Sequence, residues 1–98
     1  MKNKVLRIIN NYGVIPQLKY MQTEMFEFVE AIIKYENIPN GIYEHIKNEY
    51  KEHIAEEIAD CTVMLKQFQY YYGIEDKEIE EVMKYKIDRQ LERIKEGK

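Results

Sequence analysis

Apolar residues recur at helical spacing along most of this chain. Glycines at positions 13 and 73 and a Pro-Asn-Gly run at 39–41 interrupt the pattern, which predicts helices over about residues 2–11, 16–36, 43–72 and 76–96. Pro16 suits the first turn of the second helix, and Asp76 suits the N-cap of the fourth. We therefore predict an all-α fold in a single domain, residues 1–98, built as an antiparallel bundle of four to five helices.

The two central helices each carry an apolar stripe. The stripe of the second helix is formed by Leu18, Met21, Met25, Phe28, Val29 and Ile32. The stripe of the third helix is formed by Ile54, Ile58, Cys61, Leu65, Phe68 and Tyr72. Steps of three and four residues predict that these stripes pack against other helices. Because Ala59, Val63 and Tyr70 form a second apolar strip, we expect the third helix to touch two neighbours.

Two pairs of acidic residues border these stripes. Glu24 and Glu27 lie three residues apart on the second helix, as do Glu57 and Asp60 on the third. Residues i and i+3 project from neighbouring points of one helix face, so each pair offers two converging carboxylates. Glu27 lies further round its helix than the other acids. Enclosed carboxylates need a cation, either a metal or a basic side chain, and a ligand set made only of oxygens suits Mg²⁺ or Mn²⁺.

The last predicted helix carries a basic stripe. Lys86, Arg89 and Arg93 fall on one face, with Lys86 close to the middle of an apolar stripe. That stripe is formed by Ile79, Met83, Ile87 and Ile94. A lysine there must extend to solvent, pair with an acid or bind an anionic ligand. The acids and bases taken singly also fit an ordinary solvated surface. Taken together, they indicate a site for a metal-bound polyphosphate.

The overall charge and the cysteine content narrow the class of protein. The chain has 18 acidic and 15 basic residues, a net charge of −3, which argues against a DNA or RNA binder but allows a nucleotide binder. Cys61 is the single cysteine, so we expect no internal disulfide and a reducing, cytoplasmic location. We see no signal peptide and no apolar run long enough to span a membrane. His45 and His53 lack a glutamate three residues before them, so we interpret both as surface residues.

The residues around the acid pairs resemble those of the MazG-like nucleoside triphosphate pyrophosphohydrolases, an all-α family. The resemblance covers about residues 15–95. It rests on Glu24-x-x-Glu27, on Glu57-x-x-Asp60 within EEIAD, on Gln17 and Gln22 ahead of the first motif, on Ala31 after it, and on a final helix with lysine then arginine. The family often opens the first motif with two adjacent glutamates, whereas Thr23 precedes Glu24 here.

The resemblance implies an oligomeric bundle, a homodimer or homotetramer. It also implies Mg²⁺-dependent hydrolysis of a nucleoside triphosphate to the monophosphate and pyrophosphate, with Mn²⁺ as a substitute metal. By this resemblance the metal ligands and catalytic residues are Glu24, Glu27, Glu57 and Asp60. The residues that hold the substrate phosphates are then Lys86, Arg89 and Arg93. Glu56 is either a proton relay or, as we favour, a surface residue.

Two alternatives compete with this interpretation. Phosphoribosyl-ATP pyrophosphatase belongs to the same superfamily and has a similar length, but its second motif is usually followed by a Tyr-His pair that the segment ADCTVML lacks. The other alternative is a non-catalytic helical dimerisation module that kept the scaffold. Acids at all four ligand positions favour the enzyme, because a silent copy has no reason to keep enclosed carboxylates.

Overall fold

Four α-helices form the described part of the chain, and no strand occurs there. The computed structural model describes residues 1–39, 41 and 44–97. The helices are α1 (Lys2–Tyr12), α2 (Val14–Glu36), α3 (Glu44–Tyr71) and α4 (Asp76–Lys95). The predicted all-α class is confirmed, while the predicted interruption at 39–41 lies partly outside the described residues. Among these helices, none combines the length and the apolar character that crossing a membrane requires.

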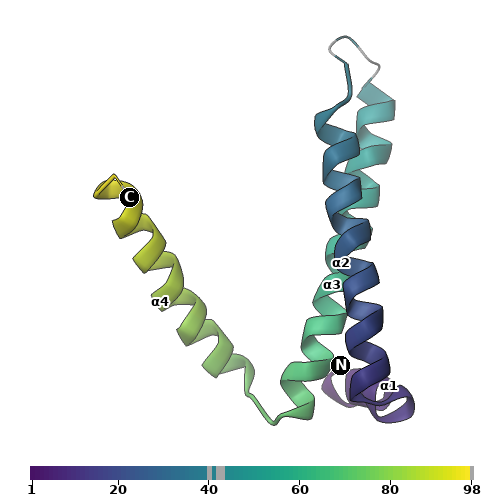
Figure 1. Cartoon of the computed structure of the whole chain (residues 1–98), viewed down its shortest axis with the longest axis vertical. Coiled ribbons are helices and arrows are strands. Elements are labelled where there is room, and N and C mark those ends of the chain that lie inside the picture. The colour runs from purple at the N-terminus through teal and green to yellow at the C-terminus, as the bar shows by residue number, and fades with distance from the viewer. Residues whose placement is uncertain (40, 42–43, 98) are drawn as a thin grey trace.

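Helices α2 and α3 lie side by side and antiparallel, and α1 packs across one end of the pair (Figure 1). The apolar core where these three helices meet is small and is formed by Val5, Ile9, Ala31, Cys61, Met64 and Tyr70. Polar side chains share this interior, among them two carboxylates and three amides: Glu24, Glu57, Gln17, Gln67 and Gln69. Buried polar groups cost free energy unless they are paired. The packing of the three helices alone does not account for these buried polar side chains.

The turn between α1 and α2 depends on Gly13. Its φ of 93° lies in the left-handed region, and a Cβ there would stand 3.6 Å from the ring Cδ of Pro16. The Gly13 amide closes α1 by donating to the Ile9 carbonyl at 2.7 Å. Pro16 lies in the first turn of α2, as predicted, where its missing N–H costs no helical hydrogen bond. This turn brings α1 back against the start of α2.

Helix α3 ends in a Schellman motif at Gly73. The Gly73 amide donates to the Tyr70 carbonyl at 3.0 Å, and the Ile74 amide donates to the Gln69 carbonyl at 2.9 Å. Gly73 adopts a φ of 71°, which a glycine reaches without strain. The motif ends α3 abruptly, and the chain turns at once into α4.

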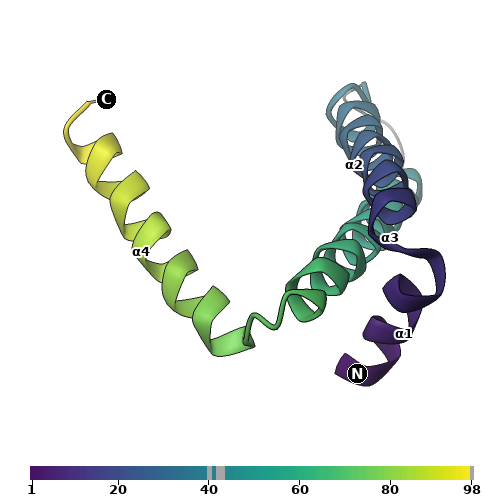
Figure 2. The ribbon, with the colours of Figure 1, turned by 60° about the horizontal axis from the view of Figure 1, so that its bottom comes forward.

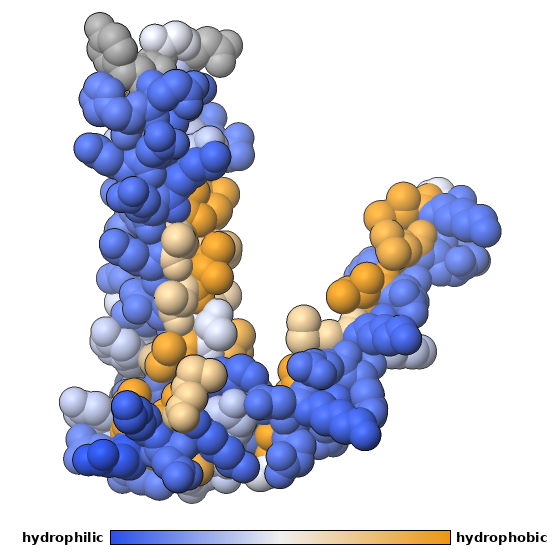
Figure 3. Space-filling model, turned by 180° about the vertical axis from the view of Figure 1, so that it is seen from behind, coloured by the Kyte–Doolittle hydropathy of each residue, from blue (hydrophilic) through white to orange (hydrophobic). Residues whose placement is uncertain are grey.

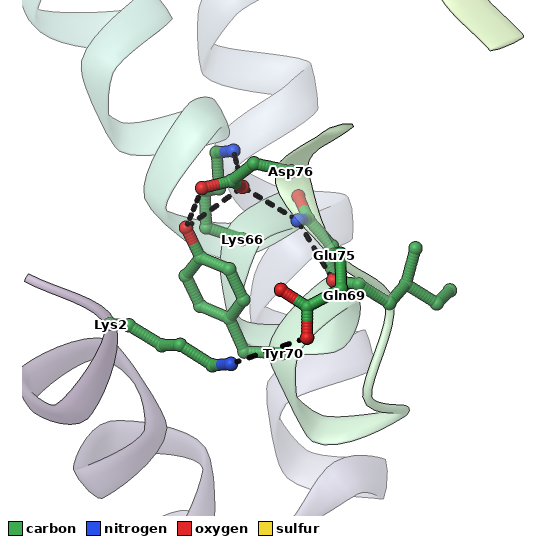
Figure 4. Close-up of polar contacts among 7 residues, drawn as sticks. Lys2, Lys66, Gln69, Tyr70, Glu75 and Asp76 are labelled. Atoms are coloured by element: carbon green, nitrogen blue, oxygen red, sulfur yellow. Dashed lines mark hydrogen bonds and ion pairs between the residues drawn. The ribbon is translucent and has the colours of Figure 1, made fainter. Parts of the chain in front are cut away.

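Asp76 stabilises the turn between α3 and α4 through its side chain and is not the N-cap of α4. The predicted N-cap role is wrong, because Glu75 is the N-cap and Asp76 is the first helical residue. The Asp76 carboxylate accepts hydrogen bonds from Lys66 Nζ at 2.7 Å, Gln69 Nε2 at 2.7 Å and the Tyr70 hydroxyl at 3.0 Å (Figure 4). Lys2 Nζ approaches Glu75 Oε1 at 4.0 Å and links α1 to the same turn. These contacts fix the direction in which α4 leaves α3.

We expect acid to loosen this turn. The Lys66, Gln69 and Tyr70 hydrogen bonds lower the pKa of Asp76 from 3.8 to about 2. A lowered folded-state pKa contributes stability above pH 3.8, and this contribution is lost as the pH falls through about 2. Asp76→Asn should therefore lower the free energy of unfolding at neutral pH, and its difference from wild type should shrink in acid. Denaturant melts over this pH range measure the effect, and the control is Asp88→Asn on the exposed surface of α4. An equal deficit at every pH would contradict it.

Beyond this turn, α4 packs against none of the other described helices. Figures 1 and 2 show it leaving the end of α3 and running away from the α2–α3 pair. The radius of gyration is 17.2 Å, against about 13 Å for a compact domain of this length. The predicted antiparallel bundle is therefore not closed within one chain.

The predicted packing of the apolar stripes is also incomplete. On the α3 stripe Cys61 is buried, but Ile58, Leu65 and Tyr72 are 50, 54 and 63% exposed. The reason is that α3 faces α2 through a neighbouring strip of its surface, which carries Glu57, Cys61, Met64 and Gln67. Much of the apolar stripe of α3 is thus left uncovered by the described part of the chain.

Candidate metal and substrate site

Carboxylates from α2 and α3 converge where the two helices face each other. One oxygen from each of Glu24, Glu57 and Asp60 lies within 4.8 Å of the others. Glu24 and Glu57 are buried, at 5 and 6% exposure, and Asp60 is exposed. The helical spacing predicted this meeting for these acids. Three carboxylates at this separation can donate oxygens to one hard cation.

Two of the carboxylate oxygens in this acidic cluster (Glu24, Glu57 and Asp60) lack a partner. Oε2 of Glu24 and Oε2 of Glu57 are buried and accept no hydrogen bond from any described residue. A buried charge without a partner is unfavourable, because nothing replaces the water that the charge loses. The side chains of the cluster offer only oxygen ligands. Two of these oxygens have no partner among the described residues, so they can coordinate a divalent cation. The residues therefore fit Mg²⁺ on the chemistry of the cluster itself.

The electrostatics of Glu57 lead to the same conclusion. Burial raises its pKa above 4.5, and the neighbouring charges of Glu27, Asp60 and Glu24 raise it further. His53 acts in the opposite direction and lowers it. The neighbouring carboxylates make Glu57 harder to ionise, so a cation bound among them would relieve the repulsion.

Glu27 is close to the acidic cluster but outside it. It is exposed and is absent from the converging set of oxygens, although its charge is the second largest cause of the raised Glu57 pKa. Glu27 and Glu57 together line a smaller hollow of about 270 Å³ on α2 and α3. The position of Glu27 further round its helix agrees with its phase in the sequence. Its role as a metal ligand stays a prediction.

The charge of the acidic cluster also raises the pKa of two neighbouring side chains. A hydrogen bond with the Glu24 carboxylate, and then the charge of that group, raise the pKa of the Tyr20 hydroxyl. Burial, followed by the charges of Glu24 and Glu57, raises the pKa of the Cys61 thiol. Cys61 Sγ lies 3.5 Å from the Glu24 backbone carbonyl and keeps α3 close to α2 at this point. Cys61 is thus a neutral packing residue, as the sequence predicted.

His53 is a neighbour of the acidic cluster that our sequence interpretation missed. Its Nε2 lies 3.7 Å from Glu57 Oε1, and its Nδ1 lies 3.7 Å from Glu56 Oε2. Its side chain is 49% exposed, which agrees with the predicted surface position. Its contact with Glu57 nevertheless connects it to the acidic cluster. The spacing could have found it, because His53 precedes Glu57 by one helical turn. Glu56 is 76% exposed, in keeping with the surface role that we favoured.

A cavity of about 580 Å³ opens beside the acidic cluster. It is bounded by α1, α2 and α3, and its wall is formed by Ile8, Tyr12, Pro16, Gln17, Tyr20, Glu24, Asp60, Val63, Met64 and Gln67. Most of this lining is apolar or aromatic, and Glu24 and Asp60 stand in its wall. Cavities of this size accept ligands of the size of a nucleotide or a drug.

The three predicted phosphate-binding residues are on α4, away from these groups. Lys86, Arg89 and Arg93 are exposed, and none of them lines the cavity beside the acidic cluster. The Arg89 guanidinium lies over the ring of Tyr85, 5.8 Å from its centroid. One copy of the chain therefore does not bring the bases to the acids.

Comparison of the whole chain with protein-family models, with curated proteins and with solved structures gave no match.

Proposed function

We propose that this protein is a Mg²⁺-dependent nucleoside triphosphate pyrophosphohydrolase, which converts a (d)NTP and water to the (d)NMP and pyrophosphate. One observation carries the proposal: carboxylate oxygens of Glu24, Glu57 and Asp60 converge within 4.8 Å of one another beside a cavity of about 580 Å³. Glu24 and Glu57 each have a buried oxygen without a partner among the described residues, and Glu24 and Asp60 stand in the cavity wall. A carboxylate cluster alone repels a polyphosphate. With a divalent cation between them, the same carboxylates attract it.

Glu24, Glu57 and Asp60 would hold Mg²⁺, or Mn²⁺ in its place. Glu27, whose charge acts on Glu57, is the fourth ligand that the family resemblance implies. A cation held by these residues would neutralise phosphate oxygens and would lower the pKa of a coordinated water. The protein contributes rigid positions for these carboxylates on two packed helices. It also supplies the burial that strengthens every charge interaction at the site. The resemblance of the acid pairs to the MazG-like family is the second support for this reaction.

The activity itself tests the proposal. Pyrophosphate release from a panel of NTPs and dNTPs should require Mg²⁺, should cease with excess chelator and should return when the metal is restored. Nucleoside monophosphate and pyrophosphate should appear in equal amounts. Release of inorganic phosphate instead would contradict cleavage at the α–β linkage. The absence of hydrolysis for every nucleotide, with Mg²⁺ or Mn²⁺, would favour the non-catalytic scaffold.

We also propose that the working enzyme contains at least two copies of the chain. Apolar side chains gather where α2 and α3 face α4, and on α4 where it faces them (Figure 3). The exposed large apolar residues of these three helices include Leu18, Met25, Val29, Ile58, Leu65, Met83, Ile87, Leu91 and Ile94. Extended apolar surfaces of this kind mark interaction sites, and the extended α4 leaves space beside them. In such an assembly Lys86, Arg89 and Arg93 of one copy can approach the acidic cluster of another.

Mixing two inactive variants tests whether the bases act between copies. Glu57→Gln removes an acid, and Lys86→Ala/Arg89→Ala/Arg93→Ala removes the bases; each should lower activity by about 100-fold. A mixed dimer regains one site with both sets intact, so subunit exchange should restore part of the activity. The control mixes each variant with itself. Full activity of the triple variant, or no recovery after exchange is verified by mass spectrometry, would contradict this arrangement.

A further inference from the structure

We propose that the cavity beside the acidic cluster holds the nucleobase of the substrate, and that the amide pair of Gln17 and Gln67 selects the base. This inference rests on the proposed function, because it assumes that the ligand of the cluster is a nucleotide. It adds the chemical part of the substrate that the cluster cannot recognise. It also assigns this recognition to α1, α2 and α3 of a single chain.

The cavity has two chemically different regions. Glu24 and Asp60 stand in its wall, so a ligand bound through a cation at these acids extends directly into the cavity. The apolar part of the wall includes Pro16, Val63 and Met64. Tyr12 and Tyr20 also line the cavity and are more than half exposed, so their rings are available to stack on a planar group. A flat heterocycle joined to a polyphosphate matches both regions.

Two buried amide side chains stand in the largely apolar wall of this cavity. Gln17 and Gln67 are 7 and 1% exposed, and both line the cavity. Gln17 Nε2 donates to Gln67 Oε1 at 2.7 Å, which joins α2 to α3 and fixes both amides. Among the residues that the structure describes, Gln67 Nε2 donates only to the weak acceptor Met64 Sδ, at 3.4 Å. Two leucines would fill the same space without burying four polar atoms.

The hydrogen bond between the amides determines what they can offer a ligand. Gln17 donates one of its two amide hydrogens to Gln67, and no described residue donates to its carbonyl oxygen, so this oxygen can accept from an N–H of the base. Gln67 uses its carbonyl, and its amide nitrogen can donate to a ring nitrogen or carbonyl of the base. Adjacent donors and acceptors are what a base presents on its hydrogen-bonding edge, and glutamine pairs with such an edge through both atoms. A site that hydrogen-bonds one edge discriminates against others far more than an apolar pocket does.

The test uses nucleosides, which lack the phosphates that the cluster would recognise. Each nucleoside is titrated without metal into the labelled full-length protein, and the side-chain amide resonances of the glutamines are followed by NMR. The preferred nucleoside should shift those of Gln17 and Gln67. Those of Gln22 and Gln90, which are exposed and line no part of the cavity, should stay in place. Inorganic tripolyphosphate with Mg²⁺ is the separate probe for the cation site.

The matched variant is Gln17→Leu/Gln67→Leu, with Gln22→Leu as its control. Wild type should prefer its best base over the worst by more than about 100-fold in kcat/KM, and the double variant should reduce this ratio to below about 10-fold. Its response to tripolyphosphate and Mg²⁺ should not change. Nucleosides that shift the two glutamines without any NTP being hydrolysed would keep this pocket and overturn the proposed function. No nucleoside shift, or an unchanged base preference in the double variant, would overturn the pocket; the shift test needs wild type alone.

Discussion

Replacing Glu57 by glutamine is expected to lower pyrophosphate release from the best nucleotide by at least about 100-fold. The substitution keeps the size of a side chain that is 6% exposed, and it removes one charge from the acidic cluster. Because the loss concerns the interaction with the cation, it should appear in kcat/KM and should shift the Mg²⁺ dependence to higher concentration. Initial rates over a range of Mg²⁺ concentrations measure both quantities.

The matched control for this variant is Glu52→Gln. Glu52 is an exposed glutamate on the same helix and takes no part in the acidic cluster. It should retain wild-type rates and a wild-type Mg²⁺ dependence. If Glu57→Gln kept full activity, or if Glu52→Gln lost as much, the assignment of Glu57 would be wrong.

Magnesium should stabilise the protein by an amount that a thermal melt resolves easily. A ligand that binds only the folded state adds about 2.7 kcal/mol when its concentration is about 100 times its Kd. For a domain of this size, each kcal/mol raises the melting temperature by about 4–8 °C. We expect this shift with Mg²⁺ or Mn²⁺ and not with sodium chloride at matched ionic strength.

The double variant Glu24→Gln/Glu57→Gln should not be stabilised by magnesium. Burial and neighbouring carboxylates raise the pKa of Glu57, so its ionised form disfavours the metal-free folded state above that pKa. Removing two of these charges should raise the melting temperature in chelator and abolish the response to Mg²⁺. The same increase with metal in wild type and variant would place the cation elsewhere. No increase in wild type at millimolar metal would favour the non-catalytic scaffold.

The helices and the acid pairs could be predicted from the sequence because both depend on local spacing. Apolar residues every three or four positions located the four helices of the described part of the chain. The same periodicity placed Glu24, Glu57 and Asp60 on faces that meet, and it marked Glu27 as the outlying acid. Nothing more than the geometry of single helices was needed for these results.

The remaining features depend on how helices meet, which local spacing does not determine. Gln17 and Gln67 are 50 residues apart in sequence, and their hydrogen bond follows from the register of α2 against α3. Asp76 has the sequence features of an N-cap, yet Lys66 and two neighbouring side chains hold it in another role. The apolar stripe of α3 predicts a partner helix, but much of the stripe is exposed in one chain, so a second chain would have to supply that helix.

A titration of Mg²⁺ into the metal-free protein, followed by calorimetry, tests the central claim most directly. That claim is that the acidic cluster of Glu24, Glu57 and Asp60 binds a divalent cation. Wild type and the Glu52→Gln control should show saturable binding with the same affinity, and Glu24→Gln/Glu57→Gln should show none over the same range. Equal binding by the double variant, or no binding by wild type, would contradict it.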